Sequence, residues 1–214
     1  MKRLLSVICI LAISVFVGCG STSSGGMKLK YESLSEKEER ILTLTGDKIL
    51  LYEISNIPKG KRFEVLISYE IYENGEKIKE EVITGIGIGG VSEKKEKVDV
   101  GVNIQNNKIS SNINMGGAIS FNSIDIDFNL KGNGRGFLVE DKYLKLGDEV
   151  YIFHGAKGNG FSPIDLGEKV DEELFREILN RHEENFLIKL SIKEITEWLR
   201  NAFLLKKWGR ILWK

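Results

Sequence analysis

Apolar and polar side chains alternate with a period of two over much of residues 49–153, and this alternation most limits what the chain can fold into. Successive side chains of a strand point to opposite faces of a sheet, so the alternation predicts β-strands with one buried face. Three runs would each place their apolar residues on a single face: Val98, Val100, Val102 and Ile104; Ile124, Ile126, Phe128 and Leu130; and Phe186, Ile188, Leu190 and Ile192. The chain is therefore expected to be mainly β.

Turn signals separate the predicted strands. The dipeptides Asn74-Gly75, Asn133-Gly134 and Asn159-Gly160 favour type I′ hairpins, because both central residues of that turn need a positive φ. The two prolines, Pro58 and Pro163, also fall between strand-like runs. Short strands joined by such turns predict an antiparallel β-sandwich or barrel-like domain over residues 31–195.

Two segments are candidates for helices. Residues 171–184 are predicted to form one C-terminal helix with Asp171 as its N-cap, and Val170 and Phe175 stand at the positions of a hydrophobic staple. Residues 35–44 could form a short helix or continue into the first strand, and the sequence leaves both open.

The alternating segment 186–193, with the sequence FLIKLSIK, carries lysines on the face opposite to its apolar residues. Lysine is typical of edge strands, where its charge prevents pairing with another sheet. Lys189 and Lys193 therefore predict that this segment is an edge strand.

The first residues have the composition of a signal peptide. Lys2 and Arg3 precede an apolar run of 14 residues, Leu4–Val17. A helix that crosses a bilayer core needs roughly 20 residues, whereas the apolar region of a signal peptide has roughly 7–15. Residues 1–18 are therefore predicted to be a cleaved leader, and the chain to be exported.

The leader ends in Phe16-Val17-Gly18-Cys19, which resembles the lipobox of bacterial lipoproteins. The resemblance implies that Cys19 receives a diacylglycerol, with acyl chains such as palmitate, and becomes the first residue of the mature protein. Phe16 departs from the usual aliphatic residue, and the alternative is an ordinary signal peptide with a cysteine near its cleavage site. Taken as a whole, the chain resembles the small lipoproteins of Gram-positive bacteria, which implies anchoring on the extracytoplasmic face of the cell membrane.

The cysteine content agrees with lipidation. The chain has two cysteines, and Cys9 lies in the leader, so Cys19 would be the only thiol of the exported protein and could form no internal disulfide. Two acyl chains hold a protein stably on a membrane, whereas one binds only marginally. Residues 19–30 are predicted to be the lipidated cysteine and a flexible tether rich in serine and glycine.

Charge excludes one class of partner. Lys and Arg together number 31, as do Asp and Glu, and the basic surplus lies in the leader and at the C-terminus, which leaves the body mildly acidic. Nucleic acids are bound by clustered basic faces, so a nucleic-acid partner is not expected.

Glycine-rich motifs in the chain lack the context of nucleotide sites. Residues 85–90 match G-x-G-x-x-G, but a strand-like segment follows where a dinucleotide site needs a helix. These glycines are instead expected to mark a bulge or the close approach of another chain segment. The sequence KGNG occurs twice, at residues 131–134 and 157–160. It lacks the Gly-Lys-Ser/Thr sequence that ends a P-loop, and it is predicted to form turns.

Acids and histidines offer few catalytic candidates. Asp125 and Asp127 would share a face of one strand, where a carboxylate pair could serve acid–base chemistry or bind a cation, although a solvated outer face has the same pattern. His154 and His182 lie in no metal-binding motif and are predicted to be surface or strand-end residues. Neither a metal nor another cofactor is therefore expected.

The C-terminal segment 196–214 contains all three tryptophans of the chain among basic residues. As a helix it would be amphipathic, and Trp with Lys and Arg is typical of segments that lie at a membrane interface. The residues predicted to contact the membrane are Trp198, Lys206, Lys207, Trp208, Arg210 and Trp213. The alternative is that this segment packs on the sandwich or on a partner protein.

Together these features predict a membrane-anchored lipoprotein that acts as a non-catalytic binding or envelope-maintenance module, with a protein or peptide as partner. A second hypothesis is a hydrolase of the cell envelope that uses carboxylates such as Asp125 and Asp127.

Overall fold

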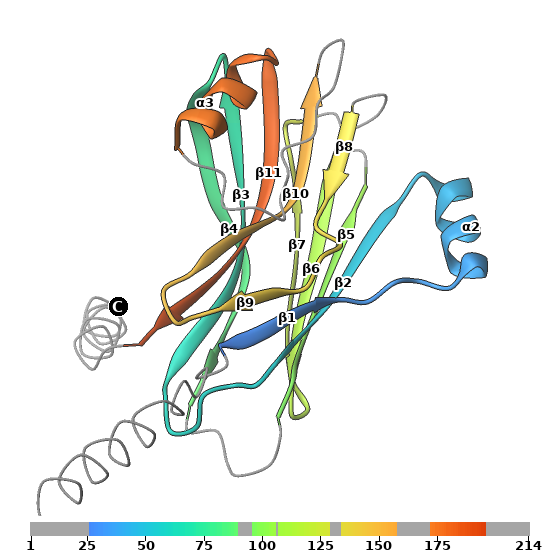
Figure 1. Cartoon of the computed structure of the whole chain (residues 1–214). Coiled ribbons are helices and arrows are strands. Elements are labelled where there is room, and N and C mark those ends of the chain that lie inside the picture. The colour runs from blue at the N-terminus through green and yellow to red at the C-terminus, as the bar shows by residue number, and fades with distance from the viewer. Residues whose placement is uncertain (1–25, 90–95, 106, 129–133, 158–171, 196–214) are drawn as a thin grey trace, which may run out of the picture.

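The computed structural model describes residues 26–89, 96–105, 107–128, 134–157 and 172–195. The helices and strands of these residues, shown in Figure 1, are β1 (Met27–Tyr31), α2 (Glu36–Thr45), β2 (Lys48–Ser55), β3 (Phe63–Glu73), β4 (Glu76–Ile88), β5 (Val98–Ile104), β6 (Lys108–Met115), β7 (Ala118–Asp125), β8 (Gly134–Phe137), β9 (Lys142–Leu144), β10 (Glu149–Lys157), α3 (Glu172–Asn180) and β11 (Glu184–Glu194).

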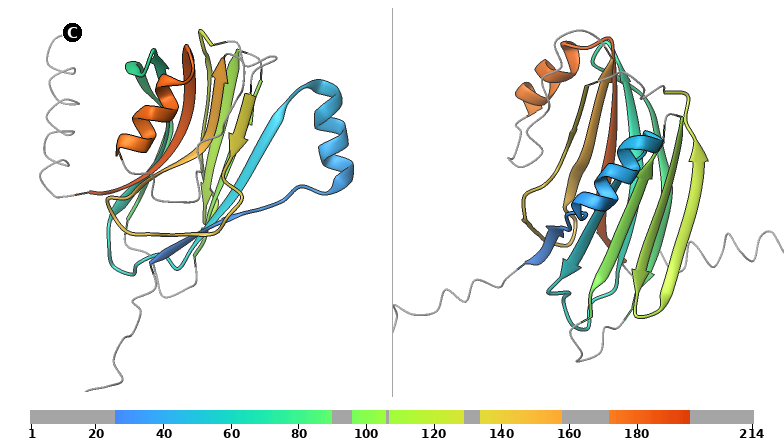
Figure 2. Two further views of the ribbon diagram at one scale, coloured as in Figure 1. Left: turned by 45° about the horizontal axis from the view of Figure 1, so that its top comes forward. Right: turned by 90° about the vertical axis from the view of Figure 1, so that its right-hand side faces the viewer.

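The described strands form two antiparallel sheets. The six-stranded sheet has the order β7-β6-β5-β2-β1-β9, and the five-stranded sheet has the order β4-β3-β11-β10-β8. In the right-hand view of Figure 2 the two layers are seen edge-on, with α3 outside the five-stranded sheet. The expectation of a mainly β, antiparallel, sandwich-like domain is confirmed.

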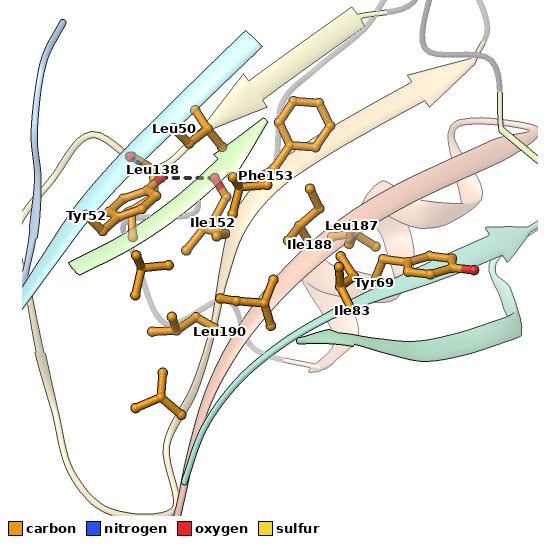
Figure 3. Packing of buried hydrophobic residues seen from close by; sticks show 14 of the residues in the cluster. Leu50, Tyr52, Tyr69, Ile83, Leu138, Ile152, Phe153, Leu187, Ile188 and Leu190 are labelled. Atoms are coloured by element: carbon orange, nitrogen blue, oxygen red, sulfur yellow. Dashed lines mark hydrogen bonds between the residues drawn. The ribbon is translucent and has the colours of Figure 1, made fainter. Parts of the chain in front are cut away.

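The core lies between the two sheets. Val98, Val100, Val102 and Ile104 of β5, and Phe186, Ile188, Leu190 and Ile192 of β11, are all buried, as their alternation predicts. Figure 3 shows Leu50 and Tyr52 of β2 near Ile152 and Phe153 of β10 in this core. The third predicted run is a strand only as far as Asp125; Ile126 and Phe128 beyond it are buried, and Leu130 lies outside the described residues.

Tyr52 connects the two sheets through the core. Its buried hydroxyl donates to the carbonyl oxygen of Leu138 at 2.8 Å, and it lies 3.3 Å from the carbonyl oxygen of Ile152 on β10 (Figure 3). A buried hydroxyl without a partner would be costly, so these bonds fix the position of β2 relative to β10.

Of the glycines at residues 85–90, Gly85 marks a close approach, as expected, whereas a Cβ on Gly87 would make only an ordinary contact. Gly85 pairs with Leu66 of β3, and a Cβ on Gly85 would lie only 2.4 Å from Leu66 Cδ2. A register shift between β3 and β4 falls next to this pair. There the Ile83 carbonyl accepts a hydrogen bond of 2.7 Å from Asn122 of β7, which links the edges of the two sheets.

The turn at Asn74-Gly75 is confirmed, since both residues have positive φ, 49° and 79°, between β3 and β4. The other two predicted Asn-Gly turns include Asn133, Asn159 and Gly160, which lie outside the described residues. The same holds for Pro163 and for both KGNG sequences, of which only Gly134 and Lys157 are described. A second tight turn, at Gly116-Gly117 between β6 and β7, also has positive φ at both residues.

Helix α2 has recognisable boundaries at both ends. Residues 35–44, which the sequence left open, form α2: the hydroxyl oxygen of Ser35 accepts from the backbone of Glu38, the Glu38 carboxylate accepts in return, and Gly46 ends the helix in the left-handed conformation. Helix α3 is shorter than the predicted 171–184, because β11 already begins at Glu184. The predicted cap Asp171 and staple residue Val170 lie outside the described residues.

The predicted tether over residues 19–30 is too long at its C-terminal end. Residues 27–30 belong to β1, which pairs with both β2 and β9 and buries Met27 and Leu29 in the core. The sandwich therefore begins no later than Met27, because that side chain is already part of the packed interior.

Candidate functional site

The predicted edge strand at residues 186–193 is wrong, and the reason leads to the most unusual site of the described structure. Strand β11 pairs with β3 on one side and β10 on the other, so it is the central strand of its sheet. Its outer face lies against α3 in part, as Figure 1 shows. Lys189, on this outer face, is only 6% exposed. A lysine is almost never this buried unless it is paired.

The partner of Lys189 is Glu70 of β3, which is 1% exposed. The Lys189 ammonium donates to Glu70 Oε1 at 2.8 Å, and Lys77 of β4 approaches the same oxygen at 3.3 Å. The hydroxyls of Tyr72 and Tyr151 donate to Glu70 Oε2 at 2.8 and 2.9 Å. Four donors therefore satisfy both oxygens of a carboxylate that water hardly reaches.

Lys189 also contacts two carboxylates that are partly exposed. Its ammonium lies 3.0 Å from Glu80 Oε1 on β4 and 3.2 Å from Glu149 Oε2 on β10. Ser191 donates to Glu149 at 3.2 Å from the next outer-face position of β11. We call Lys189, Glu70, Glu80, Glu149, Lys77, Tyr72 and Tyr151 the Lys189 cluster. It connects four adjacent strands, β4, β3, β11 and β10.

The contacts within the cluster keep its charges fixed. Burial alone would raise the pKa of Glu70 and lower that of Lys189, but the hydrogen bonds between them and to their neighbours outweigh burial, so the pKa of Glu70 is lowered and that of Lys189 is raised. Hydrogen bonds from Lys77 and Lys189 lower the pKa of Glu80 to about 2. Burial and the nearby carboxylate raise the pKa values of Tyr72 and Tyr151.

These shifts decide what the cluster can do chemically. A lysine nucleophile or a general base needs a pKa close to neutrality, whereas every shift in this cluster moves a group away from neutrality. Lys189 is a fixed cation that compensates buried negative charge. The cluster is therefore suited to holding four strands together and not to exchanging protons.

Helix α3 covers the two tyrosines of the cluster. The ring of Phe175 stacks on Tyr151, with centroids 5.3 Å apart and an angle of 13°, and meets Tyr72 edge-on at 6.1 Å. Both tyrosines thus donate hydrogen bonds to Glu70 with their hydroxyls and pack against Phe175 of α3 with their rings. The docking of α3 is coupled to the buried carboxylate.

The prediction that His154 and His182 are surface or strand-end residues is wrong. His154 is fully buried and His182 is 4% exposed, and their rings are 6.4 Å apart. Asn185 donates through Nδ2 to the Leu179 carbonyl of α3, so its Oδ1 faces His154 Nε2 at 3.0 Å and accepts the proton of that nitrogen. Burial lowers the pKa of His154 to about 4 and also lowers that of His182.

The two aspartates that the sequence offered as catalytic candidates do not lie near these histidines in the structure. Asp125 and Asp127 are exposed, at and beyond the end of the edge strand β7 in the six-stranded sheet, whereas His154 is buried in the other sheet. Among the described residues no ion pair or side-chain hydrogen bond of either carboxylate is found, and Asp127 interacts with Lys79 of β4 only through its charge. Their surroundings match the solvated face that the alternating pattern also allowed.

Several predicted site residues lie outside the described part of the chain. These are Cys19 and the residues expected to contact the membrane, Trp198, Lys206, Lys207, Trp208, Arg210 and Trp213. Within the described ranges, no three or more His, Cys, Asp or Glu side chains are grouped so that they could hold a metal ion. Neither described helix has the length and apolar character needed to cross a bilayer.

Replacing Lys189 tests the cluster. Lys189→Met would leave the Glu70 carboxylate buried without its main counter-charge, so we expect the free energy of unfolding to fall by about 3 kcal/mol or more. Urea unfolding followed by β circular dichroism measures the loss. The matched control is Lys193→Met on the same strand. The side chain of Lys193 is 56% exposed and its ammonium lies 3.8 Å from Glu149, so this variant should cost less than about 0.5 kcal/mol. Equal losses for the two variants would contradict the role of Lys189.

Acid should weaken the fold through His154. Because its pKa in the folded state is about 4 against 6.5 for an ordinary histidine, the unfolded chain binds the proton first as the pH falls. The stability it supports is complete above pH 6.5 and falls by about 3 kcal/mol as the pH approaches 4. His182 acts in the same direction. Urea unfolding across this range should show a smaller pH dependence for His154→Gln, which keeps a donor but does not titrate; an unchanged dependence would refute the assignment.

Comparisons with known proteins do not add to these observations. No protein-family model, curated protein or solved structure gives a significant match to the chain. The residues of the chain itself, above all Cys19 and the two outer faces of the sandwich, are therefore the basis on which a function can be assigned.

Proposed function

We propose that the protein is a membrane-anchored lipoprotein whose β-sandwich serves as a non-catalytic binding module on the extracytoplasmic face of the cell membrane. The observation that carries the proposal is Cys19, which follows Gly18 after an apolar run of 14 residues and is the only cysteine beyond the leader. A diacylglycerol on this sulfur would give two acyl chains, enough for stable anchoring without a membrane-spanning helix.

The described fold is compatible with such an anchor. Residues 20–26, mainly Ser and Gly, separate Cys19 from Met27, the first residue of β1. Seven residues span at most about 25 Å, so the sandwich would stay close to the membrane surface. The described chain also begins and ends near one turn: Gly26 lies against the Leu144 carbonyl, and Gly147 donates to the Ile192 carbonyl at 2.7 Å. A lipid at Cys19 and a contact by the C-terminal segment would then lie on the same side of the sandwich and reach the same membrane surface.

Binding is favoured over hydrolysis by the state of the charged groups described above. The Lys189 cluster has no group whose pKa is brought toward neutrality, and Asp125 and Asp127 stand exposed on a sheet edge. The carboxylates that are held close together, Glu70, Glu80 and Glu149, are all paired with Lys189, whereas a carboxylate hydrolase needs one acid to be protonated and the other to be free to react. A binding module needs only a stable sandwich with an accessible face.

Removal of the lipidated sulfur tests the anchor. In the wild type we expect a mature N-terminus that starts at a diacylated Cys19 and partitions into detergent. Cys19→Ala should prevent lipidation, so the protein should remain uncleaved or become soluble; mass spectrometry and detergent phase partitioning follow both properties. Cys9→Ala is the matched control and should behave like the wild type, because that residue is removed with the leader. A processed protein that still partitions into detergent after Cys19→Ala would rule out the anchor.

The C-terminal segment 196–214 is proposed as a second membrane contact. It has five basic residues and one acidic residue, with Trp198, Trp208 and Trp213 distributed along it. Anionic lipids attract such segments, and Trp settles at the level of the headgroups. Because every tryptophan of the chain lies in this segment, tryptophan fluorescence reports on it alone.

Fluorescence of the unlipidated chain from residue 20 onwards tests this contact. Phosphatidylglycerol vesicles should shift the tryptophan emission to shorter wavelength, phosphatidylcholine vesicles should do so less, and salt should reduce the effect. Replacing Lys206, Lys207 and Arg210 by Ser should weaken vesicle binding, whereas Lys193→Ser on the sandwich should not. If the emission is already shielded from acrylamide without vesicles and does not respond to them, the segment packs on the sandwich or on a partner instead.

A further inference from the structure

The outer face of the six-stranded sheet differs from that of the five-stranded sheet. In the right-hand view of Figure 2 no described helix lies against the outer side of β5, β6 and β7, whereas α3 lies against the other sheet. The strand register places side chains on this open face in rows that run across four strands. One row consists of Leu51, Gly101, Asn112 and Phe121, and the adjacent row of Ile49, Asn103, Ser110 and Ser123.

The edge of this face at β7 is apolar and exposed. Phe121 and Ile119 occupy neighbouring outer positions of β7, and each is 67% exposed. Large apolar side chains gathered on an open surface mark an interaction site more often than isolated ones do. A flat aromatic ring at the edge of a sheet offers a stacking surface to a ligand that lies across the strands.

Beside the aromatic ring the face carries neutral hydrogen-bonding groups. The hydroxyls of Ser110 and Ser123 are 2.9 Å apart. The side chain of Asn112 is exposed, whereas the amide oxygens of Asn103 and Asn114 are buried and out of reach of a ligand. Asn112 lies over Gly101, where a Cβ would be only 2.1 Å from its Oδ1. Amides and hydroxyls both donate and accept, so the band can bond a ligand whose groups do the same.

Charge defines what this face can recognise. Of the rows that flank these two, one holds Asp99 and Glu53, the latter paired with Lys97, and the other holds Lys108 and Asp125; neither of the two central rows contains an ionisable side chain. An anionic ligand would find no cation in these rows, and a cationic ligand no carboxylate. Three inter-strand spacings of about 4.8 Å give the band a width of roughly 14 Å, enough for several rings of a chain-like ligand.

We propose that the outer face of β2, β5, β6 and β7 binds a neutral oligosaccharide, with a sugar ring stacked on Phe121 and hydroxyls bonded to Asn112, Ser110 and Ser123. A pyranose chain combines apolar C–H faces with hydroxyls that donate and accept, which is the combination this face complements. The proposal deepens the proposed binding function by naming the class of ligand, and it rests on that function only in expecting the ligand outside the cytoplasm.

Calorimetric titration of the full-length protein tests the proposal. The protein is kept in a polyoxyethylene detergent, because detergents with sugar headgroups would compete. The probes are the neutral tetramers of β-1,4-linked N-acetylglucosamine and of β-1,4-linked glucose, with an acidic galacturonic acid tetramer for comparison. We expect saturable binding of at least one neutral tetramer and weaker binding of the acidic one.

Variants locate the binding. Phe121→Ala, at an exposed position where the fold should be unaffected, is expected to weaken binding by about tenfold, and Asn112→Ala by less. Tyr143→Ala is the matched control, because Tyr143 is 69% exposed on β9 at the opposite edge of the same sheet. Circular dichroism confirms that each variant is folded.

Three results would overturn the proposal: no binding of either neutral tetramer, binding that Phe121→Ala leaves unchanged, or equal weakening by Tyr143→Ala. Concentration-dependent self-association of the wild type that Phe121→Ala abolishes, without sugar binding, would instead identify the face as a contact between copies of the chain. None of these results bears on the membrane anchor, which Cys19→Ala tests by partitioning and mass, so the two proposals can fail separately.

Discussion

The ion pair between Lys189 and Glu70 is the interaction on which the five-stranded sheet depends. Strand β11 is central and loses water on both faces, so a lysine on its outer face would be costly without a counter-charge. Glu70 supplies that charge, and Tyr72 and Tyr151 complete its coordination while their rings support Phe175 of α3. Removing the lysine would leave an unpaired buried carboxylate and would loosen the helix that covers it.

The two outer faces of the sandwich consequently have different tasks. On the five-stranded sheet, α3 and the Lys189 cluster occupy the surface with contacts inside the protein, and the three carboxylates of the cluster are paired with Lys189, Lys77 and Lys193. On the six-stranded sheet, the amide of Asn112 and the ring of Phe121 are exposed. Stability is concentrated on one face, and recognition is proposed for the other.

The sequence predicted the inward faces of the strands but not the neighbours of each strand. Alternation identifies which residues of β11 are buried in the core, because that property is local. Lys189 was assigned to an edge strand because the sequence pattern does not show whether a strand that carries a lysine pairs with one neighbouring strand or with two. A signal of central placement was present in Leu187 and Asn185, which are buried on the outer face of β11; strands covered on both faces approach a continuous apolar run. His154 was misplaced for a related reason: it lies beside Asn185 of β11 and His182, and no spacing in the sequence brings these residues to β10.

The candidate binding face required the register of four strands. Leu51, Gly101, Asn112 and Phe121 come from distant parts of the sequence and form a row only because β2, β5, β6 and β7 pair in one alignment. A shift of one residue in any pair would turn one set of side chains to the core. Under the proposed anchoring, the chain leaves the sandwich near the turn between β9 and β10, while Phe121 lies on β7 at the far edge of the same sheet. The anchor and the candidate ligand site are then separated by the width of the six-stranded sheet, so attachment to the membrane need not cover the face that binds.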